Sequence, residues 1–162
     1  MSDDYVDEKL KSFETELDET ERKNNISYCA ANVDAEKYLM FTHDELSSMS
    51  AQECAMAKYV ISQHSVSIQK NLNRAIALRN WASRNLEILS SKDIVYDGTF
   101  FKYEVIRDKF IMNNSYAKKL SDIIIKEQGE IDSLSHIIAS MKSMADSLSS
   151  LAYSKKETNG NY

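Results

Sequence analysis

Residues 106–152 read IRDKFIMNNSYAKKLSDIIIKEQGEIDSLSHIIASMKSMADSLSSLA, and apolar side chains return in this segment every seven residues in two registers. The first register is Ile106, Asn113, Leu120, Glu127, Leu134, Met141 and Leu148, and the second is Phe110, Ala117, Ile124, Ile131, Ile138, Ala145 and Ala152. This spacing brings both registers to one face of a helix and is typical of a coiled-coil seam. At 1.5 Å per residue, the segment predicts one helix roughly 70 Å long. Such a seam needs a packing partner of similar length.

A second long helix is predicted to begin at about Ser50, because Ser50-Ala51-Gln52-Glu53 has the form of a capping box. The pattern continues to Lys92 and predicts about 60 Å of helix. Thr42-His43-Asp44-Glu45 has the same form and predicts a short capped turn before it. The apolar or small face of the long helix consists of Ala57, Ile61, Ile68, Leu72, Ala75, Leu78, Ala82, Leu86 and Leu89.

The two long helices are predicted to form an antiparallel hairpin. Residues 91–101 join them, and Asp97-Gly98 in this segment is a turn signal among aromatic residues that we expect to fold over the hairpin tip. Three glycines and no proline argue against a turn-rich β fold. Such a hairpin is thin for its length, so further burial must come from the amino-terminal helix, from other copies of the chain, or from both. Four polar residues interrupt the seams and are predicted to fix register and oligomeric state: His64, Asn71, Asn113 and Glu127.

The amino-terminal segment predicts an amphipathic helix that ends near Asn24 and Asn25. Its apolar stripe is Val6, Leu10, Phe13 and Leu17. A short extended piece is predicted at residues 38–41. The fold class is therefore all-α, with an acidic helical arm (residues 1–45), a long coiled-coil-like hairpin (46–156) and a disordered tail (157–162).

Charge is divided unevenly along the chain. Residues 1–53 carry 14 acidic and 5 basic side chains, residues 54–92 carry 1 and 6, and residues 93–162 carry 10 and 9. A basic middle next to an acidic arm can mean an anionic partner, or a pairing of the two segments with each other. The sequence leaves both interpretations open.

Membrane, metal and catalytic roles find little support in the residues. The apolar clusters are too short to span a bilayer, so we expect a cytoplasmic protein. Cys29 and Cys54 have no CxxC spacing and are predicted to be reduced and buried. The histidines have no second ligand at helical spacing, and no nucleotide-binding or nucleophile motif is present. We therefore expect no enzymatic activity, no metal and no cofactor.

The helix that starts at Ser50 carries a basic stripe with one aromatic residue, opposite its apolar face. Helical geometry places Lys70, Arg74, Ala77, Trp81 and Arg84 within about 80° of one another. Cations attract phosphates, and an exposed indole can stack on an unpaired base, so the stripe suits single-stranded nucleic acid. Arg79 points nearer the seam. In the competing interpretation, Trp81 packs against the acidic amino-terminal helix and the cations pair with its carboxylates.

Two segments carry a resemblance to a known family: YVISQHSVSIQKNLNRAIALRNWASRNL at residues 59–86 and ADSLSSLAYSKK at residues 145–156. They resemble the UvsY-like recombination mediators of T4-like phages, and the layout covers about two thirds of the chain. The resemblance implies a homo-oligomer that binds single-stranded DNA and helps a recombinase displace the single-strand-binding protein in the cytoplasm of an infected host. It also implies that Lys70, Arg74, Arg79, Trp81 and Arg84 bind DNA.

Two other functions are compatible with the same residues. A structural helical oligomerisation or scaffold protein, such as a virion component, would bury all its faces against other subunits. An acidic inhibitor would mimic nucleic acid with its amino-terminal arm. We take the mediator as the leading hypothesis and the structural or scaffold protein as its alternative.

Overall fold

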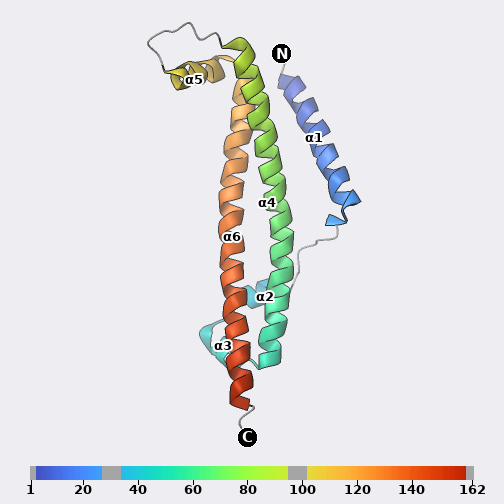
Figure 1. The fold of residues 1–162 in the computed structure, drawn as a ribbon, viewed down its shortest axis with the longest axis vertical. Coiled ribbons are helices and arrows are strands. Elements are labelled where there is room, and N and C mark those ends of the chain that lie inside the picture. Colours follow the sequence, from blue (N-terminus) through green and yellow to red (C-terminus); the bar gives the residue numbers. More distant parts are fainter. Residues whose placement is uncertain (1–2, 27–33, 95–101, 160–162) are drawn as a thin grey trace. The chain divides into compact units, whose positions relative to one another are not determined.

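The computed structural model describes residues 3–26, 34–94 and 102–159, and every element in these ranges is a helix (Figure 1). The helices are α1 (Asp3–Lys23), α2 (Ala35–Leu39), α3 (His43–Ser48), α4 (Ala51–Asp93), α5 (Tyr103–Asn113) and α6 (Ser115–Asn159). The two long helices α4 and α6 pack against each other, and α1 is an additional amino-terminal helix. The predicted all-α hairpin with an amino-terminal helix is therefore confirmed.

The chain divides into two compact units, each containing part of α4 and part of α6. Unit 1 comprises Met1–Asn25 and Asn73–Asp132, and unit 2 comprises Ile26–Leu72 and Ser133–Tyr162. The segments predicted from the sequence are continuous stretches of chain, whereas each of these units groups residues that contact one another in space. As a result, α2, which lies in the predicted arm, and α3, which crosses the end of that arm, belong to unit 2, and α1 belongs to unit 1.

The core of unit 1 is built by α1, α4 and α6. Buried side chains from the three helices form one cluster, which consists of Val6, Ala82, Leu86, Tyr116, Ala117 and Leu120. Ala82 and Leu86 belong to the predicted face of α4, and Ala117 and Leu120 belong to the predicted seam of α6. Because α6 enters this core with its first turns and α4 with its later turns, the two helices run antiparallel, as predicted.

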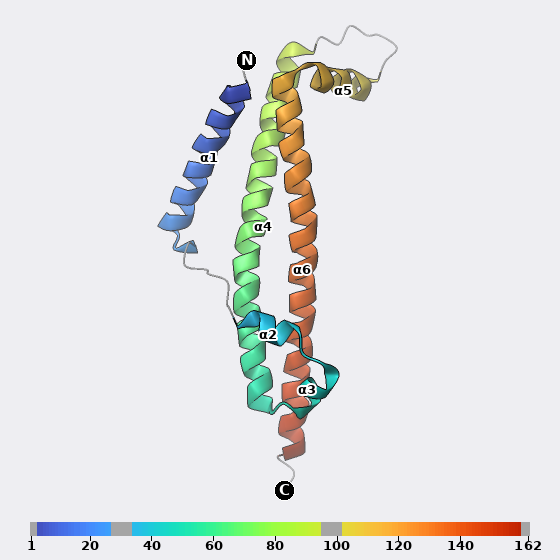
Figure 2. The ribbon, with the colours of Figure 1, turned by 180° about the vertical axis from the view of Figure 1, so that it is seen from behind.

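The core of unit 2 joins the start of α4 to the second half of α6, with α2 and α3 packed across them (Figure 2). Its buried side chains are Cys54, Ala57, Ile61, Met141, Ala145 and Leu148. The burial predicted for Cys54 is confirmed, whereas Cys29 lies outside the described residues.

Both predicted capping boxes are present at the helix starts of unit 2. The Ser50 backbone N–H donates to the Glu53 carboxylate at 2.6 Å, and the Glu53 N–H donates to Ser50 Oγ at 3.2 Å. Thr42 and Glu45 make the same reciprocal pair at the start of α3. These bonds lower the pKa of both glutamates below the ordinary value of 4.5, because the carboxylate form accepts them. Local sequence therefore fixes where α3 and α4 begin.

The single helix predicted for residues 106–152 is wrong in one respect, because it is broken at Asn114. This residue has an extended backbone (φ −119°, ψ 111°), so the chain forms α5 and α6 instead of one helix. Asn114 Oδ1 accepts the backbone N–H of Ala117 at 3.1 Å, which makes Asn114 the amino-terminal cap of α6. An asparagine that can cap a new helix competes with continuation of the old one. The seam thus begins at Ala117, and Ile106 and Phe110 lie on α5.

The four polar residues that interrupt the predicted seams differ in how deeply they are buried. Glu127 is buried at 4 % exposure in unit 1, and its carboxylate lies 3.2 Å from Lys126 Nζ. His64 is partly buried in unit 2, with an Nδ1 atom that finds no hydrogen-bond partner among the described residues. Asn71 and Asn113 are exposed. The prediction that they are buried in the seams is therefore wrong, and Asn113 is the last residue of α5.

Three further predictions concern connecting and terminal segments. The extended piece predicted at residues 38–41 is wrong for Tyr38 and Leu39, which belong to α2. Residues 157–159, which the sequence assigned to a disordered tail, are the end of α6, and residues 160–162 lie outside the described ranges. Residues 95–101 of the connection between the long helices, whose aromatic side chains were expected to fold over the hairpin tip, also lie outside the described ranges. Among the described helices, none combines the length and apolar content needed to cross a membrane.

Candidate nucleic-acid interface

The basic stripe of unit 1 lies on the side of α4 that faces away from α6. Ala75 and Ala82 are buried at 2 % and 0 % exposure on the inner side. Around the helix, Arg74 and Trp81 lie about 80° to 120° from these alanines and Arg84 about 160° to 180°, because successive residues are separated by about 100°. In unit 1, this outer side of α4 lies beside α1 (Figure 1).

Trp81 is partly buried, because it packs against the core cluster of unit 1 and the ring of Phe13 stacks on its indole. The ring centroids are 5.7 Å apart and the planes differ by 16°. This is an offset stacked geometry, which aromatic pairs favour over a face-to-face sandwich. The stacking surface of Trp81 therefore receives a flat ring in the folded chain, and that ring belongs to α1.

Arg74 is paired with two carboxylates of α1. Its Nη1 atom lies 2.6 Å from Asp18 Oδ1, which accepts a hydrogen bond from it, and 3.5 Å from Glu21 Oε1. The hydrogen bond to Asp18 raises the pKa of the Arg74 guanidinium, and the charges of Asp18 and Glu21 act in the same direction. This guanidinium thus has negative oxygens around it, as it would have on a phosphate.

Arg79 and Arg84 take different positions. Arg79 Nη1 donates to Gln128 Oε1 on α6 at 2.7 Å, and its Nη2 donates to the neighbouring Asn80 at 3.0 Å. The sequence placed Arg79 near the seam, and this bond to α6 agrees with that position. Arg84 is exposed.

Lys70 belongs to unit 2, where it is partly buried. The structure therefore brings Arg74, Trp81 and Arg84 together in unit 1, directs Arg79 toward α6, and places Lys70 in the other unit. We call the group of Arg74, Trp81 and Arg84 the outer face of α4.

Three residues that contact this face were not among the sequence-predicted site residues: Phe13, Asp18 and Glu21. Phe13 appeared only as part of the apolar stripe of the amino-terminal helix. The signal that pointed to them was the charge asymmetry, since residues 3–23 contain nine acidic and four basic side chains. Helical geometry could assign Trp81 to the outer side of α4, but it could not say what lies opposite.

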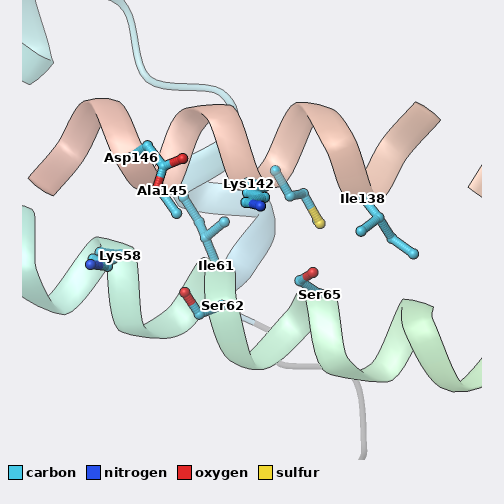
Figure 3. A pocket seen from close by; sticks show the side chains of 9 residues that line it. Lys58, Ile61, Ser62, Ser65, Ile138, Lys142, Ala145 and Asp146 are labelled. Atoms are coloured by element: carbon cyan, nitrogen blue, oxygen red, sulfur yellow. The ribbon is translucent and has the colours of Figure 1, made fainter. Parts of the chain in front are cut away.

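A second candidate feature is a hollow of about 240 Å³ between α4 and α6 in unit 2 (Figure 3). Its floor is apolar and its rim carries two lysines, an aspartate and two serines. The lining residues are Lys58, Ile61, Ser62, Ser65, Ile138, Met141, Lys142, Ala145 and Asp146. In the part of the chain that the structure describes, no group of three or more His, Cys, Asp or Glu residues is arranged to hold a metal ion.

The comparisons with known proteins give no match. No protein-family model matches the chain, and no curated protein and no solved structure matches it. The resemblance to UvsY-like mediators therefore rests on the residues quoted for it, and the function must be argued from the site itself.

Proposed function

We propose that this chain is a non-enzymatic recombination mediator that binds single-stranded DNA on the outer face of α4. One observation carries the proposal: in the folded chain an aromatic ring stacks on Trp81 and a carboxylate pairs with Arg74. Single-stranded nucleic acid offers these same two groups, as bases that stack on aromatic side chains and as phosphates that pair with cations. Duplex DNA keeps its bases stacked on one another and would leave Trp81 without a base.

The wider role follows from the resemblance to UvsY-like mediators. In this role the chain acts as a homo-oligomer in the cytoplasm of a phage-infected host, gathers single-stranded DNA, and helps a recombinase displace the single-strand-binding protein. It needs no cofactor. Several copies, each with a weak basic face, would bind one strand far more tightly than one copy does.

A titration of fluorescently labelled oligo(dT) at several salt concentrations tests the DNA-binding step. The two cations of this face, Arg74 and Arg84, predict a slope of about −1.4 for each engaged protomer in a plot of log affinity against log salt. The double substitution Arg74→Ala with Trp81→Ala should abolish most of the binding at low salt. Absence of binding by the parent protein at low salt, or binding unchanged in the double variant, contradicts the proposal.

A matched pair of single variants separates the outer face of α4 from general positive charge. Arg84→Gln removes one exposed cation from this face, and Arg107→Gln removes one exposed cation from α5. We expect Arg84→Gln to weaken binding and to lower the salt slope by about 0.7, because one phosphate contact is lost from a single strand. Arg107→Gln should leave the slope unchanged. Equal effects of the two would mean that DNA responds to net charge and not to this face.

The alternative is a structural helical oligomerisation or scaffold protein, and one observation favours it. On α4 of unit 2, Met56, Tyr59 and Val66 are 54 %, 59 % and 53 % exposed at spacings that share one side of the helix. Exposed apolar side chains grouped in this way are typical of a surface that meets another subunit. For a scaffold, Trp81 emission is blue-shifted in the free assembly and unchanged by DNA, and the mass in solution is that of an oligomer.

A further inference from the structure

The contacts of α1 in unit 1 fall into two groups. The first turns of α1 are anchored next to α6: Val6 is fully buried, the Tyr5 and Tyr116 rings lie 6.0 Å apart, and Lys119 Nζ lies 2.5 Å from Asp7. The second half of α1 makes the ring stack and the ion pairs with α4. An anchored beginning and a charged second half are therefore separate features of one helix.

The second half of α1 presents to α4 the same chemistry as a single strand. Phe13 occupies the stacking surface of Trp81, and Asp18 and Glu21 supply anionic oxygens to Arg74. A base and a phosphate cannot reach these two side chains while α1 lies on them. Both ligands would need the same surface at the same time.

The contacts in the second half of α1 are weak enough to exchange. Arg74, Asp18 and Glu21 keep 28 %, 54 % and 18 % of their side-chain surface exposed, and ion pairs that solvent reaches are screened by salt and contribute little. Phe13 and Leu17 are partly exposed, in contrast to the fully buried Val6. Release of the second half therefore exposes little of the core of unit 1.

We infer that α1 is an intramolecular mimic of single-stranded nucleic acid, and that its second half must leave the outer face of α4 before a strand can bind there. The inference rests on the proposed function, since it names the regulation of that same face. When a segment of the chain competes, the apparent affinity is the intrinsic affinity multiplied by the fraction of molecules whose face is free. It also favours long strands over isolated anions, because a strand replaces several contacts together.

The test uses two full-length variants with the same change in net charge. Asp18→Asn with Glu21→Gln removes both carboxylates that pair with Arg74. Glu16→Gln with Glu19→Gln removes two exposed carboxylates of α1 and serves as the control. Each variant is titrated with labelled oligo(dT) at one low salt concentration, beside the parent protein.

Loss of the two partners of Arg74 should tighten DNA binding by about fivefold or more, because a larger fraction of molecules has a free face. The control should stay within about twofold of the parent. A second measurement needs no DNA. Trp81 is the single tryptophan of the chain, so acrylamide quenching of its fluorescence reports its exposure. Quenching should increase in the Asp18 and Glu21 variant, increase further when Phe13→Ala is added, and stay at the parent value in the control.

The remaining outcomes overturn the inference in distinguishable ways. If all three proteins bind DNA with equal affinity, α1 does not compete with the strand, while the proposed function stands. If both double variants bind more tightly by the same factor, net charge explains the effect, and α1 does not compete with the strand for the outer face of α4. If none of them binds at low salt, the proposed function fails, and the inference fails with it.

Discussion

In each unit, a segment from the first fifty residues packs on the two long helices, but different interactions hold the two segments in place. In unit 2, α2 and α3 are joined directly to α4 at Ser50, and apolar side chains seat them on the core. Lys155 of α6 also donates to backbone carbonyls of the Leu46–Met49 segment. In unit 1, the second half of α1 is held by one ring stack and partly exposed ion pairs.

Because of this difference, α2 and α3 are a fixed part of unit 2, whereas the second half of α1 can be exchanged for another ligand. Backbone carbonyls at a helix end need partners in every state of the folded protein, so a side chain that satisfies them stays in place. Carboxylates and a ring that pair with a cation and an indole can be replaced by another anion and another ring. We therefore expect perturbations of unit 2 to change stability, and perturbations of α1 to change binding.

The largest effects should come from the two cores. Leu120→Ala in unit 1 and Leu148→Ala in unit 2 each truncate a side chain that is 0 % or 2 % exposed, which should cost about 2 to 5 kcal/mol of the free energy of unfolding. Chemical denaturation measures both. Because Leu120 shares its core with Val6, only Leu120→Ala should also increase acrylamide quenching of Trp81. Increased quenching in Leu148→Ala would contradict this separation of the two cores.

A smaller effect should follow removal of the Lys155 ammonium. Its Nζ donates to the carbonyls of Leu46 at 3.2 Å and Ser47 at 2.9 Å, and also to that of Met49. Lys155→Met keeps most of the apolar stem and leaves these carbonyls without their charged donor, which should cost about 1 to 3 kcal/mol.

The matched control for Lys155 is its exposed neighbour, through Lys156→Met. This variant makes the same chemical change and should leave the free energy of unfolding within about 0.5 kcal/mol of the parent. Trp81 quenching should not change in either variant. Equal stability of the two variants would mean that the carbonyls find water as readily as they find Lys155.

The smallest effect concerns pH and the caps of unit 2. The folded protein lowers the pKa of Glu53 below 4.5, so this carboxylate stabilises the fold above about that pH and loses its contribution as the pH falls through the folded value. Glu53→Gln keeps a group that can accept the Ser50 N–H but cannot titrate. The melting temperature of the parent should therefore fall more steeply between pH 5 and 3 than that of Glu53→Gln, by about 1 to 3 °C. Parallel pH profiles would exclude a role for this cap in acid stability.

Local signals in the sequence predicted most of the fold. The heptad registers predicted the buried side of α6 from Ala117 onward, and the spacing of apolar residues predicted the inner side of α4. Two capping boxes gave the starts of α3 and α4. The break at Asn114 also had a local signal, since asparagine followed by Ser115 is a good helix start, but the continuous heptad pattern outweighed it in the sequence interpretation.

The candidate site was predicted less completely. The sequence placed Arg74, Trp81 and Arg84 on one side of α4, and it left open whether DNA or the acidic arm lies against them. Helical geometry grouped Lys70 with them and the resemblance added Arg79, whereas Arg79 contacts Gln128 and Lys70 belongs to unit 2. Residue spacing within a helix gives the direction of a side chain, but the segment that meets it can come from anywhere in the chain.

The sequence by itself determined the helices, their apolar sides and the outward position of Trp81, because these depend on contacts between residues a few positions apart. Only the tertiary structure decided that Phe13 lies on Trp81 and that Asp18 lies on Arg74, across 68 and 56 positions of the chain. Docking of α1 depends on the summed burial of Val6, ring stacking and charge pairing between distant segments. No local sequence pattern predicts the combined effect of these distant contacts.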